Sequence, residues 1–136
     1  MRFDTKIAVV VREDLPTWQK LNMTAFLVSG IAARQSETTG ENYVDGSGNI
    51  YLPMFRQPVL VFTGPAAAVR SAYERAMERK VKLAIFTEAL FGTGNDVDNR
   101  AAVMATSGPD LKLAGMAFHA DRKLADKILK GLSLHP

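Results

Sequence analysis

A few polar side chains in this sequence stand where a binding or catalytic site needs them: Asn22, Ser29, Glu88, Thr93 and His119. Asn22 and Ser29 are seven positions apart in a run, residues 21–33, that contains no charged residue. On a helix this spacing places both side chains on nearly the same face. Glu88 and His119 each follow an apolar run, and open α/β sheets bind ligands beyond the carboxyl ends of their strands. These positions predict a polar crevice at the strand ends, next to the first helix.

The stretch GTGND, residues 92–96, contains glycines of the kind that let backbone N–H groups approach an anion. It lacks the glycine spacing of a dinucleotide-binding loop and the Lys-Ser/Thr ending of a nucleoside triphosphate-binding loop. The carboxylates of Asp96 and Asp98 would also repel phosphate. Asp96, Asp98 and Asn99 have the ligand chemistry of a hard-cation site, but the spacing of an EF-hand is absent. We therefore expect a loop that caps a helix, with no metal ion and no cofactor.

The sequence contains no cysteine, which excludes disulfides, thiolate metal sites and a cysteine nucleophile and fits a cytoplasmic protein. The two histidines, His119 and His135, have no companion at metal-ligand spacing, so we expect no zinc site. A nucleophilic Ser29, Ser107 or Thr93 would need a histidine and an acid brought close by the fold, and none has the pattern of a nucleophile elbow. Whether the protein is an enzyme stays open at this point.

Composition predicts one α/β domain over residues 1–136. With 47% hydrophobic and 23% charged residues, the chain resembles ordinary globular proteins and is long enough to bury one core. The apolar run near the N-terminus, residues 7–11, is too short for a secretory signal or a membrane span. A net charge of +3 without interleaved aromatic residues permits a phosphate-bearing partner but does not favour a nucleic acid.

Apolar runs rich in branched residues predict four strands of a buried sheet: residues 6–11, 58–64, 81–86 and 111–118. Helical patterns cover residues 17–34, 65–80 and the segment from 121 to a cap at Gly131. Residues 95–105 fit a short helix, with a strand as the competing interpretation. The first helix is apolar around most of its circumference, which predicts that it is buried. Together these elements predict a three-layer α/β/α fold with a four-stranded mixed sheet.

Residues 35–58 are richer in Ser, Thr, Gly and Asn and predict a hairpin insertion, with two tyrosine-containing runs around DGSGN within residues 41–55. One interpretation is a solvated flap. The other is that its apolar side chains cover a pocket or a neighbouring subunit: Tyr43, Tyr51, Met54 and Phe55. The second interpretation predicts a homo-oligomer, most simply a dimer.

The run KIAVVVREDL, residues 6–15, resembles the opening of the peptidyl-tRNA hydrolases of the archaeal and eukaryotic type. Their signature is a strand that ends in Arg, a variable residue, Asp and Leu, and Arg12, Asp14 and Leu15 match it. As a whole, the sequence more closely resembles a small bacterial family of uncharacterised proteins, through KLNMTAFLVSGI and the closing GLSLHP. That family is similar in fold to these hydrolases. The resemblance therefore implies a fold and no activity.

The hydrolases carry a lysine and a histidine where this sequence has Asn22 and Ser29. An asparagine cannot supply a positive charge, and a serine cannot shuttle protons near neutral pH as an imidazole does. Glu88 and Thr93 correspond to an aspartate after the third strand of the hydrolases and to the threonine that follows it. His119 would have to replace the missing imidazole. The favoured hypothesis is therefore a small polar ligand bound by Asn22, Ser29, Glu88 and Thr93. The alternatives are a peptidyl-tRNA hydrolase, which cleaves a carboxylic ester, and a non-catalytic, oligomerising structural protein.

Overall fold

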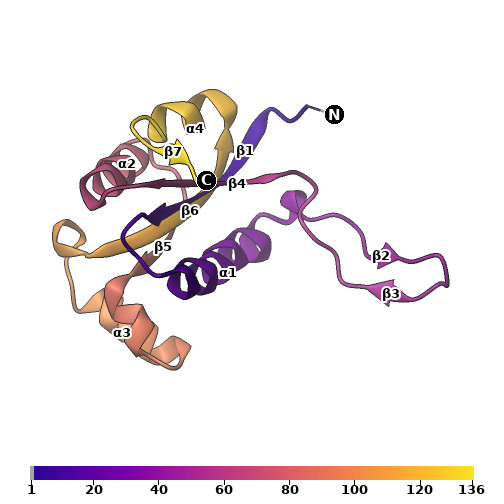
Figure 1. Ribbon diagram of the computed structural model, residues 1–136, viewed down its shortest axis with the longest axis horizontal. Coiled ribbons are helices and arrows are strands. Elements are labelled where there is room, and N and C mark those ends of the chain that lie inside the picture. The colour runs from indigo at the N-terminus through magenta and orange to yellow at the C-terminus, as the bar shows by residue number, and fades with distance from the viewer. Residues whose placement is uncertain (1) are drawn as a thin grey trace.

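The computed structural model describes residues 2–136, and its body is a mixed sheet with helices on both faces (Figure 1). The sheet has five strands in the order β5-β6-β1-β4-β7. Their bounds are Thr5–Arg12 for β1, Val59–Gly64 for β4, Ala84–Thr87 for β5, Leu113–Asp121 for β6 and Ser133–Leu134 for β7. The predicted α/β fold with a mixed sheet is confirmed. The predicted number of four strands is wrong, because the two residues of β7 are too few to show the alternation that marks a strand.

The direction of the strands decides which loops meet. β1 and β4 run parallel, whereas β6 lies between β1 and β5 and is antiparallel to both. The C-terminal ends of β1, β4 and β5 therefore meet at one end of the sheet, together with the start of β6. We call this the carboxyl end of the sheet. The opposite end holds the start of β1 and the end of β6, where Thr5 pairs with Asp121.

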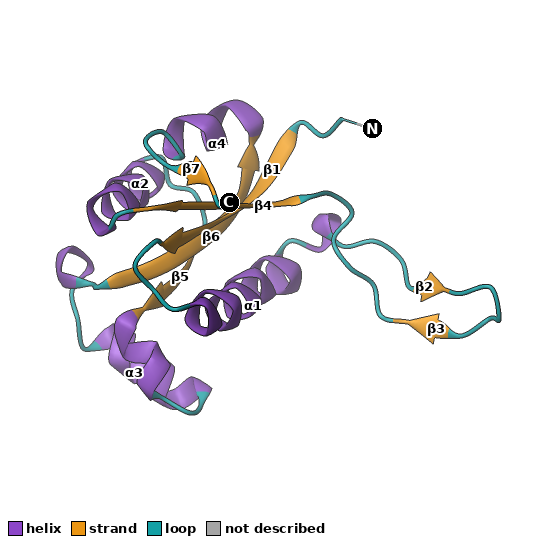
Figure 2. Cartoon of the chain, viewed as in Figure 1, coloured by secondary structure: helices purple, strands orange, loops and turns teal. Residues whose placement is uncertain are grey.

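Four helices complete the body, and three of them form the outer layers. α1 (Thr17–Arg34) covers one face of the sheet, and α2 (Ala66–Glu78) and α4 (Arg122–Ile128) cover the other (Figure 2). This arrangement confirms the predicted three layers. Gly115 of β6 lets α1 lie close to the sheet, because a Cβ at this position would stand 2.7 Å from the sulfur of Met23.

The prediction that α1 is buried nearly all round is wrong. Met23, Leu27 and Ile31 are buried, but much of the rest of the helix surface is apolar and exposed, including Trp18 and Leu21. The reason is that α1 has the sheet on one side and no further layer of this chain on the other. A helix with this composition would be buried if a second surface lay against it.

Two predictions about the loops are confirmed. Residues 95–105 form a helix, α3 (Asp96–Met104), and the Asn95 side chain caps it by accepting a hydrogen bond from the backbone N–H of Asp98 at 2.9 Å. The insertion forms a hairpin of two short strands, β2 (Tyr43–Val44) and β3 (Ile50–Tyr51). This hairpin projects away from the body, beyond the C-terminal end of α1 (Figure 1).

Candidate functional site

Arg12 organises the carboxyl end of the sheet. It is the last residue of β1, and its guanidinium donates one hydrogen bond to Asp14 Oδ1 and one to Glu88 Oε1, each at 2.6 Å. Glu88 begins the short 3-10 turn η2 (Glu88–Gly92) directly after β5. Because β6 alone separates β1 from β5, two residues 76 positions apart in sequence reach each other. The carboxylate of Glu88 is therefore held in one orientation.

The charges of this group reinforce one another. Burial opposes the charge of Arg12, but the hydrogen bonds and charges of Asp14 and Glu88 outweigh it, so the pKa of Arg12 is raised above its ordinary value. The hydrogen bond from Arg12 lowers the pKa of Asp14, and the nearby charge of Lys20 adds to this effect. Arg12 and Asp14 are thus kept ionised at neutral pH.

A second polar pair, Lys20 and His135, lies near the start of α1. Lys20 Nζ lies 3.1 Å from His135 Nε2, and His135 Nδ1 lies 2.9 Å from the backbone oxygen of Pro136. A lysine ammonium has donors only, so His135 Nε2 accepts and the ring proton is on Nδ1. Sequence analysis missed this pair, because only the pairing of β7 with β4 brings the end of the chain next to the start of α1.

Next to Glu88 lies a pocket of about 450 Å³ between η2, α3 and the short turn η3 (Gly108–Asp110). Its polar lining residues are Glu88 and Asp110, which carry carboxylates, together with Lys112, Thr87 and Thr106. Ala102 and Leu111 supply apolar walls. One oxygen of Glu88 is engaged by Arg12 and one oxygen of Asp110 by Ser107, at 2.9 Å. Among the described residues the second oxygen of each carboxylate accepts no side-chain hydrogen bond, so both can accept from a ligand.

Aromatic packing positions the turn that carries Glu88. Trp18, in the first turn of α1, meets Phe91 of η2 edge to face, with the ring centroids 6.0 Å apart. Phe91 also packs against Phe86 of β5, at 4.8 Å between centroids. These contacts fix η2 between the helix and the sheet, so Glu88 is placed by rigid elements on both sides.

The structure does not bring Asn22 and Ser29 to this pocket. They share one face of α1 as predicted, but both are exposed, and the Ser29 hydroxyl donates to the backbone oxygen of Phe26 at 2.5 Å. Ser29 instead borders an apolar pocket of about 310 Å³ at the root of the hairpin. Thr93 does not line the Glu88 pocket either. Its hydroxyl forms hydrogen bonds with the backbone oxygen of Leu90 and with the Asn99 side chain, and thereby joins η2 to α3.

His119 lies at the opposite end of the sheet from Glu88. It follows an apolar run, as the sequence indicated, but β6 is antiparallel to β1, so the end of β6 is far from the carboxyl ends of β1 and β5. There the His119 ring lies 2.9 Å from Thr5 Oγ1 and 4.0 Å from the Glu37 carboxylate. His119 therefore cannot replace an imidazole next to Glu88.

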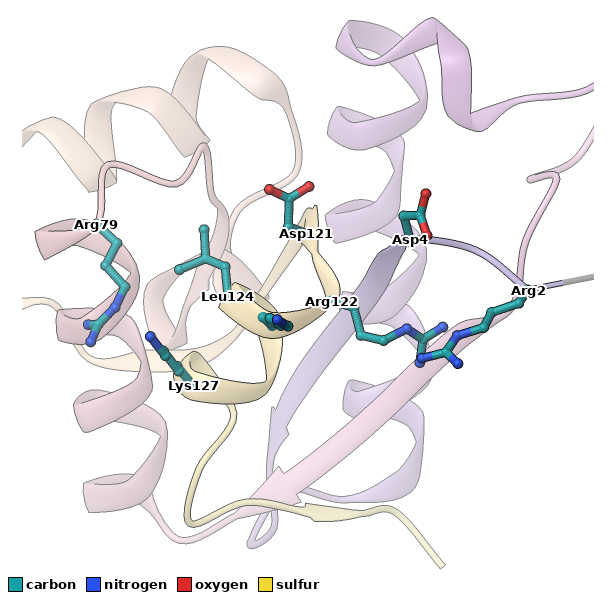
Figure 3. Close-up of a pocket in the computed structure, with 8 residues that line it drawn as sticks. Arg2, Asp4, Arg79, Asp121, Arg122, Leu124 and Lys127 are labelled. Atoms are coloured by element: carbon teal, nitrogen blue, oxygen red, sulfur yellow. The ribbon is translucent and has the colours of Figure 1, made fainter.

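A larger cavity, about 660 Å³, lies at that opposite end and has a mainly basic lining (Figure 3). Its cations do not converge. Arg79 and Lys127 stand near Leu124, whereas Arg122 extends away from them toward Arg2 (Figure 3). The guanidinium of Arg122 is also occupied, because it donates twice to the backbone oxygen of Phe3, at 2.8 and 3.2 Å. This cavity is therefore a weaker candidate than the Glu88 pocket.

The described part of the chain contains neither a cluster of metal ligands nor a helix that could span a membrane. Between residues 2 and 136 no group of three or more His, Cys, Asp or Glu side chains is placed to hold a metal ion. Over the same residues, no helix has both the length and the apolar character needed to cross a membrane.

Comparisons with known proteins identify relatives but no activity. A solved structure of a protein of unknown function, Atu0240 from Agrobacterium tumefaciens strain C58, is similar with a TM-score of 0.96 and 47% sequence identity, covering 99% of this chain and 100% of that one. No curated protein matches the chain. A family described as protein of unknown function (DUF2000) matches residues 5–136. The chain therefore belongs to the DUF2000 family.

Proposed function

We propose that the protein binds a small polar ligand carrying an ammonium group in the pocket next to Glu88. The observation that carries the proposal is a pocket of about 450 Å³ at the carboxyl end of the sheet. Two carboxylates, Glu88 and Asp110, line it, and each has one oxygen engaged in a side-chain hydrogen bond and one available to a ligand. Small-molecule sites typically occupy ~300–1,000 Å³ and combine apolar walls with a few polar groups. This pocket has the size and the composition of such a site.

The position of the pocket supports the proposal. Open α/β sheets bind ligands beyond the carboxyl ends of their strands, and the pocket lies directly beyond β5. Arg12 holds Glu88 before any ligand arrives, at 2.6 Å. A binding group that is already oriented loses little conformational freedom on binding, which favours affinity.

The charge of the lining supports the ligand class. Glu88 and Asp110 place two negative charges in the wall, and Lys112 places one positive charge there. An ammonium group can donate to the free oxygen of each carboxylate. A carboxylate or hydroxyl elsewhere on the same ligand can then meet Lys112 and Thr106. The favoured ligands are therefore amino alcohols, diamines and amino acids.

We do not propose peptidyl-tRNA hydrolase activity. The imidazole of those hydrolases has no replacement beside Glu88, because His119 lies at the other end of the sheet and His135 Nε2 is bound by Lys20. A resemblance in fold to those hydrolases stays a proposal. Its support is the match of Arg12, Asp14 and Leu15 to their signature.

Isothermal titration calorimetry tests the proposal with four ammonium probes, ethanolamine, putrescine, lysine and betaine, and with glycerol and acetate as probes that lack this group. We expect at least one of the first four to bind with one site per chain, and glycerol and acetate to give no binding. Betaine separates charge from hydrogen bonding, because its quaternary nitrogen cannot donate. No binding by any ammonium probe at about 10 mM would overturn the proposal.

Substitution locates the site. Glu88→Gln keeps the size of the side chain and removes its charge, so we expect binding at least tenfold weaker, since a hydrogen bond to a charged group contributes ~1.5–3 kcal/mol. Glu78→Gln is the matched control, because Glu78 is exposed on α2, outside the pocket. Equal binding by Glu88→Gln and Glu78→Gln would place the ligand elsewhere.

A further inference from the structure

Exposed apolar side chains gather on one part of the molecule. Thirteen large hydrophobic residues of the described chain are exposed, and nine of them lie on α1 or on the hairpin. The nine are Trp18, Leu21, Phe26, Tyr43, Val44, Ile50, Tyr51, Leu52 and Met54. We call residues 39–56 the arm, and the arm with the exposed side of α1 the arm–helix surface. Exposed apolar side chains gathered on neighbouring elements mark an interaction site.

The arm has no core of its own. β2 and β3 contain two residues each, and all four side chains are exposed. The tip is held by Asp45, which accepts hydrogen bonds from Asn49 and Tyr51, and the root is held by backbone bonds such as Gly40 N to Met54 O at 3.0 Å. A two-stranded hairpin that covers nothing is at best marginally stable in water. The local bonds give the arm a defined shape, and its apolar side chains still need a partner surface.

The exposed side of α1 is suited to close contact with a protein partner. Residues 21–33 carry no charge. On the exposed side of the helix, the small residues Ala25, Ser29 and Ala32 lie between Leu21 and Phe26. Charged residues are depleted from the cores of protein interfaces, and small residues leave room for side chains from the other partner. This composition also explains the polar residues Asn22 and Ser29 without a ligand.

The two parts of the surface adjoin but do not cover each other. The root of the arm meets α1 at the apolar pocket between Val28, Ala32, Met54 and Phe55. From there the arm extends beyond the end of the helix, and its tip is far from the body of its own chain (Figure 2). The arm therefore cannot lie along its own α1.

We propose that two copies of this chain associate around a two-fold axis, with each arm packed across the exposed side of α1 of its partner. A two-fold interface uses the same patch on both subunits, so that patch must be self-complementary. The arm–helix surface meets this requirement, because it combines a projecting apolar hairpin with an apolar, uncharged helix face.

The available area is sufficient for a stable dimer. Aromatic side chains bury ~150–250 Å² each and aliphatic ones less, so nine that are about half exposed or more offer on the order of 900 Å² over the helix and both faces of the arm, against ~800 Å² per partner in a standard stable interface. This inference concerns a different surface from the Glu88 pocket, and it holds or fails independently of the ligand.

Sedimentation velocity on the full chain tests the inference. We expect a species of twice the 14.9 kDa chain mass at ~100 μM protein. Phe26→Glu on α1 and Leu52→Glu on the arm each place a charge in the interface, so we expect dimer dissociation constants at least tenfold higher. Met77→Glu and Val97→Glu are matched controls, because these side chains are also exposed but lie outside the arm–helix surface. Circular dichroism checks that every variant is folded.

Cross-linking identifies the contact itself. Because the chain has no cysteine, Phe26→Cys and Leu52→Cys can be prepared separately, mixed and oxidised. We expect a disulfide-linked heterodimer from this mixture and much less from Leu52→Cys mixed with Met77→Cys. A monomer at ~100 μM would overturn the proposal and leave a different protein or a lipid surface as the partner. A dimer insensitive to Phe26→Glu and Leu52→Glu would also overturn it, because another surface would then form the interface.

Discussion

Removing the charge of Arg12 or of Glu88 should reveal a measurable coupling between the two side chains. Their atoms are 2.6 Å apart, and the Arg12 side chain is 12% exposed, but Glu88 is 43% exposed. Fully exposed pairs contribute ~0.2–1 kcal/mol, and hydrogen bonds to charged groups that are better shielded contribute ~1.5–3 kcal/mol. Because solvent screens the carboxylate side of this pair, we expect a coupling free energy of about 1 kcal/mol.

A double-mutant cycle measures this coupling. The free energies of unfolding of wild type, Arg12→Gln, Glu88→Gln and the double variant are obtained from urea denaturation at one fixed protein concentration. The coupling should fall in 1 M NaCl, where the Debye length is ~3 Å. Arg12 with Glu74 serves as a control cycle, because Glu74 lies on α2 and pairs with Arg70 instead. A coupling below ~0.2 kcal/mol would refute the claim that Arg12 holds Glu88 in place.

Three further outcomes follow from the contacts. Gly115→Ala places a Cβ 2.5 Å from a backbone oxygen of β1 and should lower the free energy of unfolding, measured by urea denaturation, by ~1–3 kcal/mol. Gly46 has open space around it, so Gly46→Ala should change this free energy by less than ~0.5 kcal/mol. Asp45→Ala removes the acceptor at the arm tip, so the Asn49 amide should exchange faster with deuterium while sheet amides keep their rates. Arg12 lowers the pKa of Asp14, so ionised Asp14 contributes ~0.5 kcal/mol to the free energy of unfolding above pH ~3.9. This contribution is lost as the pH falls through the folded-state pKa. Asp14→Asn should abolish this part of the acid dependence of unfolding.

The strands of the body were predictable because a buried strand has a distinctive composition. The run that forms β1 is apolar and β-branched, and all of Ile7–Val11 is buried as expected. β7 was not predictable. It pairs with β4 at only two residues, and such pairing depends on the backbone rather than on side-chain pattern.

The burial of α1 was predicted wrongly for a physical reason. An apolar residue contributes the same hydrophobicity to a sequence pattern whether it faces the core of its own chain or another surface. Met23 is fully buried against the sheet, whereas Phe26, three positions later, touches Phe86 at the edge of the buried face and is more than half exposed. Periodicity reports that both are apolar and cannot separate the two environments.

The candidate site was located partly from sequence. Glu88 was expected at the end of a strand next to the first helix, and it lies at the carboxyl end of the sheet. His119 was expected at the same end, but strand direction is set by long-range pairing, and β6 proved antiparallel. Arg12 was noticed only through a family signature, since its partner Glu88 is 76 positions away. Asp110 was missed because no local pattern distinguishes it from other surface acids.

The binding of an ammonium ligand beside Glu88 is most directly tested by nuclear magnetic resonance. Spectra of the ¹⁵N-labelled protein are recorded during titration with ethanolamine, putrescine and lysine in turn. We expect the backbone amides of Ala89, Thr106 and Lys112, which line the pocket, to shift with a single saturable curve. The amides of Ser29 and His119 should keep their positions. Absence of shifts at the pocket, or saturable shifts confined to the other end of the sheet, would contradict the account.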